Sequence, residues 1–312
     1  MNMNKKEKRK DYLSSLKSIE TENIIDRVFY RPVGYKIAKA LQNTGITPNT
    51  ITVISIFIGV SAGIAWYFPY DLGLAILGVA ALIFANILDC VDGQLARLTG
   101  IKSEIGRILD GVAGDLWFLS IYIALAHRLS VQYADILSPW YFVILILLSG
   151  LSHLGQASQT DYYKTLHLFF ISNEKGKEFE NSGTVIKRYE TMPRGIGKVA
   201  TWAYIYYTKY QEKATPRLQH LLSILHIQYG GMLPEGVREK LREGSLKLMP
   251  LLDFSTFNGR SIVLFISVIF NVVWFYFVWE VVVLNILKWT IKRRHENFCR
   301  EVIGDFGTER FA

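Results

Sequence analysis

Three aspartates near the middle of the chain have a spacing that could hold a metal ion. Asp89 and Asp92 are three residues apart in a stretch that predicts a helix, so their carboxylates share one helical face. Gly106 and Asp110 are four apart on the next predicted helix. Because only a short turn separates these helices, their ends bring all three carboxylates together. Oxygen ligands of this kind suit a hard divalent cation, either Mg²⁺ or Mn²⁺.

These carboxylates lie beside strongly apolar segments that predict membrane-spanning helices. An ionised carboxylate at bilayer depth costs about 2.5–3.5 kcal/mol on insertion scales, so the group needs a compensating partner. One explanation is a buried polar cluster in which Arg97 and Arg107 neutralise the aspartates. Such a cluster would not require the spacing, or the glycines Gly93 and Gly106, which remove side chains where a ligand or a neighbouring helix comes close. We therefore favour a ligand site.

The aspartates belong to a longer pattern of residues that is similar to a family signature. The residues of this pattern are, in chain order, Asp89, Asp92, Gly93, Ala96, Arg97, Gly106 and Asp110. Their order and spacing resemble the signature of the CDP-alcohol phosphotransferases (CDP-alcohol phosphatidyltransferases), integral membrane enzymes that build phospholipid head-group linkages. A Pro48-Asn49 pair before a threonine-containing first span resembles in particular the branch that acts on inositol phosphates.

The resemblance implies the chemistry of the site. A metal-dependent reaction would transfer a substituted phosphoryl group from a CDP-linked donor, such as CDP-diacylglycerol or a related CDP-lipid, to an alcohol hydroxyl, with release of CMP. Asp89, Asp92 and Asp110 would hold the metal. Arg97 would contact a phosphate of the nucleotide, since a guanidinium makes charge-assisted hydrogen bonds to phosphate. The small residues Gly93, Ala96 and Gly106 would complete the binding site for the CDP group.

The chain departs from the family pattern at one position. The fourth aspartate of the signature, four residues after the third, is Gly114 here, and Asp115 comes one residue later. On a regular helix Asp115 points roughly 140° away from Asp110, whereas residue 114 lies at roughly 40°. We take Asp115 as the candidate general base. This requires a π-bulge or similar distortion between 110 and 115, for which Gly111 and Gly114 supply flexibility.

The acceptor alcohol is less well defined by the sequence. Lys102, Arg107 and Arg260 could form a basic site for inositol or an inositol phosphate, but each could equally be an interfacial residue whose charge reaches the headgroups. Glycerol phosphate, serine and ethanolamine stay open as acceptors. Transfer from CDP-ethanolamine or CDP-choline to a diacylglycerol- or ceramide-type alcohol stays open as well. Polar residues at helical spacing from Ser149 to Gln159 either line the acceptor pocket or bond neighbouring helices.

Two alternatives belong to other functional classes. A non-catalytic relative would have lost its base at Gly114 and would bind nucleotide or lipid. An ion-coupled carrier would place carboxylates near the bilayer midplane in both halves of the chain, yet the last apolar block contains only Glu280. Metal-dependent release of CMP separates the enzyme from both.

The distribution of apolar residues predicts an all-α, polytopic membrane helix bundle. The chain has 312 residues, of which 50% are hydrophobic. The apolar runs cover residues 51–68, 72–91, 116–126, 140–151 and 261–287. Basic residues near both termini favour the cytoplasmic side for each, so the number of crossings is even, and we expect six.

These runs divide the chain into five parts. We expect a cytoplasmic tail and an amphipathic interfacial helix in residues 1–45, and four spans with the signature in 46–159. A cytoplasmic insertion follows in 160–260, spans five and six in 261–294, and a cytoplasmic tail in 295–312. The interfacial helix should cover 24–41 with a break or kink near Pro32. Thr47 should cap the first span, with Pro48 at its first helical position.

Charge and cysteines bear on partners and location. The net charge of +8 fits Lys and Arg on cytoplasmic loops beside anionic lipid, and no nucleic-acid motif accompanies it, so we expect no nucleic-acid partner. The basic start lacks a cleavage site and predicts a tail, not a signal peptide. We expect no disulfide between Cys90 and Cys299. The expected partners are the CDP-linked donor, the alcohol acceptor and the bilayer, with a homodimer kept open. The expected location is the bacterial inner membrane, with the active site and termini facing the cytoplasm.

Overall fold

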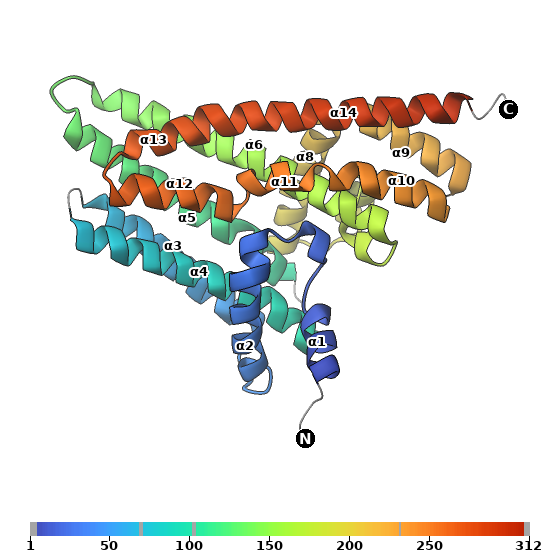
Figure 1. Cartoon of the computed structure of the whole chain (residues 1–312), viewed down its shortest axis with the longest axis horizontal. Coiled ribbons are helices and arrows are strands. Elements are labelled where there is room, and N and C mark those ends of the chain that lie inside the picture. Colours follow the sequence, from blue (N-terminus) through green and yellow to red (C-terminus); the bar gives the residue numbers. More distant parts are fainter. Residues whose placement is uncertain (1–4, 69–70, 102–103, 231, 309–312) are drawn as a thin grey trace. The chain divides into compact units, whose positions relative to one another are not determined.

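A computed structural model describes residues 5–68, 71–101, 104–230 and 232–308. Within these residues the chain is helical and contains no strand, which confirms the predicted all-α class (Figure 1). The chain forms two compact units. Unit 1 comprises residues 1–154 and 257–282, and unit 2 comprises residues 155–256 and 283–312. The long helix α6 (Pro139–Ile171) contributes its first half to unit 1 and its second half to unit 2.

Unit 1 begins with short helices that lead to the first span. They are α1 (Lys5–Ser14), the 3₁₀ turn η1 (Ile19–Thr21), the π-helix η2 (Asp26–Tyr30) and α2 (Arg31–Leu41). Residues 24–41 stay helical without the predicted break, and the helix changes from π to α just before Pro32; a kink there stays a prediction. Hydrogen bonds from Lys39 and Tyr35 tie Asp11 to α2 and hold the pKa of that carboxyl below its usual value. Placement of this segment at the membrane surface stays a prediction.

Three antiparallel helices form the centre of unit 1. They are α3 (Pro48–Tyr67), α4 (Leu72–Thr99) and α5 (Glu104–Gln132). The predicted cap of the first span is confirmed, because Thr47 accepts a hydrogen bond from the amide of Thr50 and Pro48 opens the helix. Helices α3 and α5 touch at Gly59 and Gly63, where an added Cβ would overlap other side chains. This close contact holds α5, which carries Asp110 of the signature, against the first span.

The last apolar block forms a sharp hairpin within the described part of the chain. Helix α12 (Phe257–Ile269) ends before Asn271, which has a positive φ of 55° and whose amide oxygen accepts from Arg128. The chain then continues as α13 (Val273–Val278), the π-helix η5 (Trp279–Val283) and α14 (Leu284–Thr308). The block therefore forms two helical stretches, and their assignment as spans five and six stays a prediction.

Unit 2 contains the segment predicted as an insertion, and it is also helical. Its elements are η3 (Lys175–Glu178), α7 (Ser182–Thr191), α8 (Ile196–Ala214), α9 (Pro216–Tyr229), α10 (Glu235–Leu246), α11 (Met249–Leu252) and η4 (Asp253–Ser255), with the second half of α6 and most of α14. Their shared core includes Tyr163, Leu218, Leu241 and Ile291. The core explains why this charged segment folds, because its apolar residues face α6 and α14.

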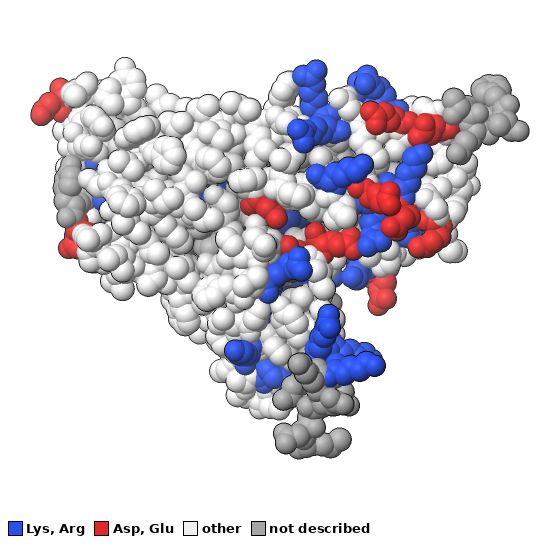
Figure 2. Space-filling model, in the orientation of Figure 1, with Lys and Arg blue, Asp and Glu red and all other residues white. Residues whose placement is uncertain are grey.

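In the part of the chain that the structure describes, six helical stretches are long and apolar enough to cross a bilayer, as predicted. They are Pro48–Tyr67, Leu72–Thr99, Leu109–Gln132, Pro139–Ile171, Glu235–Ile269 and Val273–Phe306. Large apolar side chains are exposed on them, for example Phe57, Trp140 and Leu151. On the face shown in Figure 2, the surface over α3, α4 and α12 is almost uncharged, whereas charged residues gather over α9 and α10. Exposed apolar side chains and a lack of charge are what lipid contact requires. The protein is an integral membrane protein.

Candidate metal and active site

The structure brings the three signature aspartates together. Asp89 and Asp92 lie near the end of α4, and Asp110 lies in the second turn of α5. One carboxylate oxygen of each lies within 4.8 Å of the others. Asp92 is buried, Asp89 is half-buried and Asp110 is exposed, so the group opens to solvent on one side. Left-handed Gly100 ends α4 and allows the reversal that returns α5 to the same place.

A threonine of the first span fixes the buried aspartate. Thr52 Oγ1 donates a hydrogen bond of 2.5 Å to Asp92 Oδ2, and it also contacts the carbonyl of Pro48. Thr52 is itself buried. This hydrogen bond restricts the rotation of the Asp92 carboxylate within the cluster. Sequence reasoning did not assign this role to Thr52, although buried hydroxyls on an otherwise apolar span are a usable signal.

The N-terminal segment packs on the signature helix. Arg97 Nε donates to the carbonyl of Ser15, and Gln94 Nε2 donates to Ser15 Oγ (3.1 Å) and to the carbonyl of Arg31 (3.2 Å). The guanidinium of Arg97 passes over Gly93, where a Cβ would lie 3.2 Å from Arg97 Nη2. Gly93 therefore makes room for Arg97. Donor binding by Gly93, Arg97 and the half-buried Ala96 and Gly106 stays a prediction.

Asp115 lies apart from the three signature aspartates. Helix α5 is a regular α-helix through residues 110–115, so the predicted bulge between Asp110 and Asp115 is wrong. The reason is that backbone hydrogen bonds continue unbroken through both glycines of this segment. Asp115 Oδ1 lies 3.5 Å from Nε2 of the buried His153 on α6. Its side chain keeps 39% of its surface exposed, so it stays available to a substrate.

The basic residues proposed for the acceptor have different surroundings. Arg260 is buried and forms an ion pair with the buried Glu280, which also accepts from Tyr276 (3.3 Å). His153 Nδ1 lies 3.8 Å from Glu280 and 3.0 Å from the hydroxyl of Tyr122. Buried charges persist in proteins when they are paired in this way.

Lys102 and Arg107 are the other two basic residues predicted for the acceptor site. Lys102 lies outside the described residues. The backbone of Arg107 belongs to α5, but its side chain also lies outside them. An acceptor role for these residues and for Arg260 stays a prediction.

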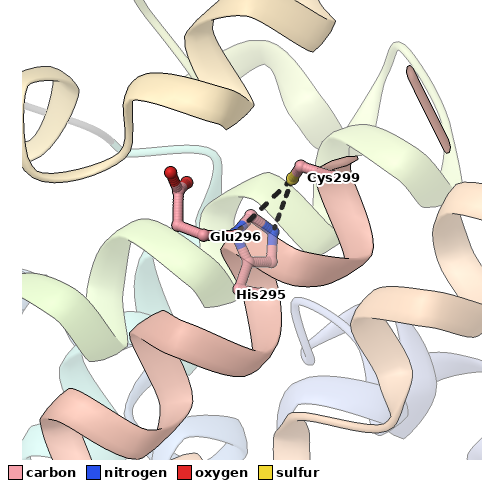
Figure 3. A group of neighbouring side chains, drawn as sticks. All are labelled: His295, Glu296 and Cys299. Carbon is pink, nitrogen blue, oxygen red and sulfur yellow. Dashed lines mark hydrogen bonds between the residues drawn. The ribbon is translucent and has the colours of Figure 1, made fainter. Parts of the chain in front are cut away.

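A second cluster of metal-binding residue types lies in unit 2. His295, Glu296 and Cys299 are buried neighbours on α14 (Figure 3). The Cys299 sulfur lies 3.8 Å from His295 Nδ1, and the ring of His295 packs 4.4 Å from that of Tyr163. The Glu296 carboxylate accepts from the first amides of α9, with 2.9 Å to that of Arg217. Each group thus has a structural partner, so helix capping and packing account for this cluster.

Comparison with known proteins agrees with the signature. The family model described as CDP-alcohol phosphatidyltransferase matches residues 45–171. Residues 45–171 form a CDP-alcohol phosphatidyltransferase domain. This segment runs from the cap of α3 to the end of α6 and contains the three clustered aspartates and Asp115. The family match leaves residues 172–312 unmatched.

Curated relatives match in the same segment. An archaetidylinositol phosphate synthase of Pyrococcus horikoshii is 37% identical over 91 residues, which are 29% of this chain and 46% of the relative. A synthase of that name from Aeropyrum pernix is 31% identical over 110 residues, covering 34% and 55%. A bifunctional IPC transferase and DIPP synthase of Thermococcus kodakarensis is 28% identical over 132 residues, covering 41% and 27%. The chain spans about half or less of the length of these relatives.

Proposed function

We propose that this protein transfers a substituted phosphoryl group from a CDP-linked lipid to an inositol-type alcohol and releases CMP. The observation that carries the proposal is the convergence of Asp89, Asp92 and Asp110 within 4.8 Å, inside a CDP-alcohol phosphatidyltransferase domain. The names of the curated relatives support an inositol-phosphate acceptor, and CDP-diacylglycerol or a related CDP-lipid is the donor we favour. The location we favour is the bacterial inner membrane, with the site on the cytoplasmic side.

The three carboxylates fit a hard divalent cation. They offer oxygen atoms only, they come from two rigid helices, and one of them is preset by Thr52. Bound Mg²⁺ or Mn²⁺ would supply charge neutralisation for the pyrophosphate of the donor. The exposed side of the cluster, at Asp110, is where such a donor would approach. Arg97 lies one turn beyond Gly93 on the same face and would bind a nucleotide phosphate.

The acceptor hydroxyl must lose a proton when the new phosphate ester forms. We propose Asp115 as the base that accepts it, because this carboxylate is accessible and the buried His153 orients one of its oxygens. The leaving group is CMP, which departs with the electron pair of the broken phosphoanhydride bond. An ion-coupled carrier is less well supported, since Glu280 is paired with Arg260.

The test is CMP release by full-length protein in proteoliposomes with CDP-diacylglycerol and inositol phosphate. We expect Asp89→Asn, Asp92→Asn and Asp110→Asn each to lose activity while folding normally, because the carboxylates act during transfer and not in packing. Asp135→Asn, an exposed carboxylate in the turn after α5, is the matched control. Near-normal activity of any two cluster variants would remove the metal assignment. Manganese binding, followed by electron paramagnetic resonance, should weaken in the same three variants.

A further inference from the structure

Unit 2 contains a cavity of about 220 Å³ between three of its helices. Its wall is formed by the second half of α6, the end of α8 and the beginning of α14. At roughly 30 Å³ per water molecule, the cavity has room for roughly seven waters. Its volume is therefore larger than that of a phosphate group. None of the signature residues lines it.

Hydrogen bonds between the helices fix the shape of this cavity. Gln211 Nε2, on α8, donates to the carbonyl of Ser158 on α6 (3.0 Å). Gln159 Nε2, on α6, donates to the carbonyl of Lys288 on α14 (2.9 Å). Each bond joins a side-chain amide of one helix to the backbone of another. The helices around the cavity are therefore held in place by hydrogen bonds within unit 2.

Two lysines give the cavity a positive charge. Lys288 and Lys292 are four residues apart on α14, so both ammonium groups lie on the same face. Among the described residues, neither forms an ion pair with a carboxylate. The missing side chain of Gly155 opens the wall, because a Cβ there would lie 2.9 Å from Lys288 Nζ and 3.7 Å from Tyr210 Oη. An ammonium and a phenol hydroxyl thus converge over one open spot, which is an arrangement that suits an anionic oxygen group.

An exposed aromatic face runs along α8 and ends at the cavity. Val199, Trp202, Tyr206 and Tyr210 are more than half exposed and are spaced three or four residues apart, so they share one face. Tyr210 lines the cavity, and so does Trp289 of α14, which is 58% exposed. Tryptophan and tyrosine are enriched at the headgroup level of membranes, and a helix with an exposed apolar face and lysines binds there.

The sequence of α14 also gives the depth of the cavity in the bilayer. Residues 281–287 carry no charge, and Lys288 is the first basic residue after this apolar run. Such a position marks the boundary between hydrocarbon and headgroups. The lysines, the tryptophan and the aromatic face of α8 therefore all indicate the same level of the membrane.

We propose that this cavity binds the phosphate of an anionic phospholipid headgroup from the surrounding bilayer. Lys288 and Lys292 contact the phosphate oxygens, Tyr210 and Gln159 supply polar contacts, and the apolar face of α8 lies along the acyl chains. Basic pockets beside membrane helices bind anionic headgroups in this way. This site is separate from the aspartate cluster, and the proposal does not depend on the proposed function.

The test uses purified full-length protein in detergent, titrated with phosphatidylglycerol or phosphatidylcholine and analysed by native mass spectrometry. We expect one phosphatidylglycerol to bind more tightly than the rest. In Lys288→Gln/Lys292→Gln its affinity should fall by about 10- to 30-fold. The matched control is Arg294→Gln/Arg300→Gln, which removes the same charge from exposed positions of the same helix. The control should bind as the unaltered protein does.

Two further variants keep the test decisive if the double glutamine variant does not fold. Lys288→Arg/Lys292→Arg keeps both charges and should bind. Gly155→Leu keeps every charge but adds bulk to the cavity, where its Cβ would lie 2.9 Å from the flexible end of Lys288, and should lose the tight lipid. Equal binding by the unaltered protein and Gly155→Leu would overturn the proposal. So would a loss of affinity in Arg294→Gln/Arg300→Gln as large as that in Lys288→Gln/Lys292→Gln. The melting temperature should also rise more with phosphatidylglycerol than with inorganic phosphate. An equal rise with inorganic phosphate alone would assign the cavity to free phosphate and overturn the proposal of a lipid ligand.

Discussion

Replacing Asp115 by asparagine tests the assignment of the general base. Its carboxylate is 39% exposed and makes one described contact, 3.5 Å from His153, so the change should leave folding intact. If Asp115 removes the proton of the acceptor, Asp115→Asn should lower kcat by about 10²- to 10⁴-fold, the usual contribution of a positioned base. KM for the CDP-linked donor should change little, because the proposed mechanism assigns donor binding to the aspartate cluster and Arg97.

Moving the carboxylate by one residue makes this test sharper. Gly114 lies roughly 40° around α5 from Asp110, and a Cβ built there meets no atom within 4 Å. The double variant Gly114→Asp/Asp115→Asn therefore places a carboxylate on the face of the cluster without a clash. We expect it to recover part of the activity lost in Asp115→Asn, by about tenfold or more.

The assay is CMP release in proteoliposomes, followed at saturating donor and at several concentrations of inositol phosphate. Gly114→Asn/Asp115→Asn is the control, since it adds a side chain of the same size without a carboxylate. An Asp115→Asn variant with activity within about threefold of the unaltered protein would refute the assignment, as the expected loss is at least about 100-fold. Full activity in all of these variants would assign proton removal to water.

Three other predictions follow from contacts elsewhere in unit 1 and from the expected topology. Thr52→Val should lower activity by about 10- to 100-fold, because a hydrogen bond to a charged group contributes about 1.5–3 kcal/mol, while Thr52→Ser should retain most of it. Arg260→Ala should destabilise the protein by about 3–5 kcal/mol by leaving the buried Glu280 without its guanidinium partner, whereas Arg260→Met/Glu280→Leu should melt near the unaltered protein. A thiol reagent that stays outside intact cells should fail to label Lys187→Cys, an exposed position in α7. Labelling there would contradict a cytoplasmic unit 2. Both native cysteines are buried, so they should give little background labelling.

The sequence predicted the parts of the site that local periodicity determines. The spacing of Asp89 and Asp92 and the short turn before Asp110 were enough to place three carboxylates together, because helical geometry fixes which residues share a face. The cap formed by Thr47 and Pro48 was predictable for the same local reason. The reversal at Asn271 could only be expected from the length of the apolar block.

Contacts between distant segments were not predictable. The bond from Thr52 to Asp92 joins residues 40 positions apart, and the bond from Arg97 to Ser15 joins residues 82 apart. Hydrophobic periodicity carries no information about such pairs. The bulge between Asp110 and Asp115 was predicted wrongly, because Gly111 and Gly114 permit a distortion of the helix but do not require one.

The hydrogen bond from Arg97 to the carbonyl of Ser15 has a practical consequence for shortening the protein at its N-terminus. A chain that begins after Ser15 would lose the carbonyl that receives Arg97 Nε and the hydroxyl that receives Gln94. Arg97, which already interacts electrostatically with Asp92, would then lose the contact that fixes its guanidinium. Residues 5–15 precede every span, yet Ser15 sets the position of a cation on the helix that carries two of the signature aspartates.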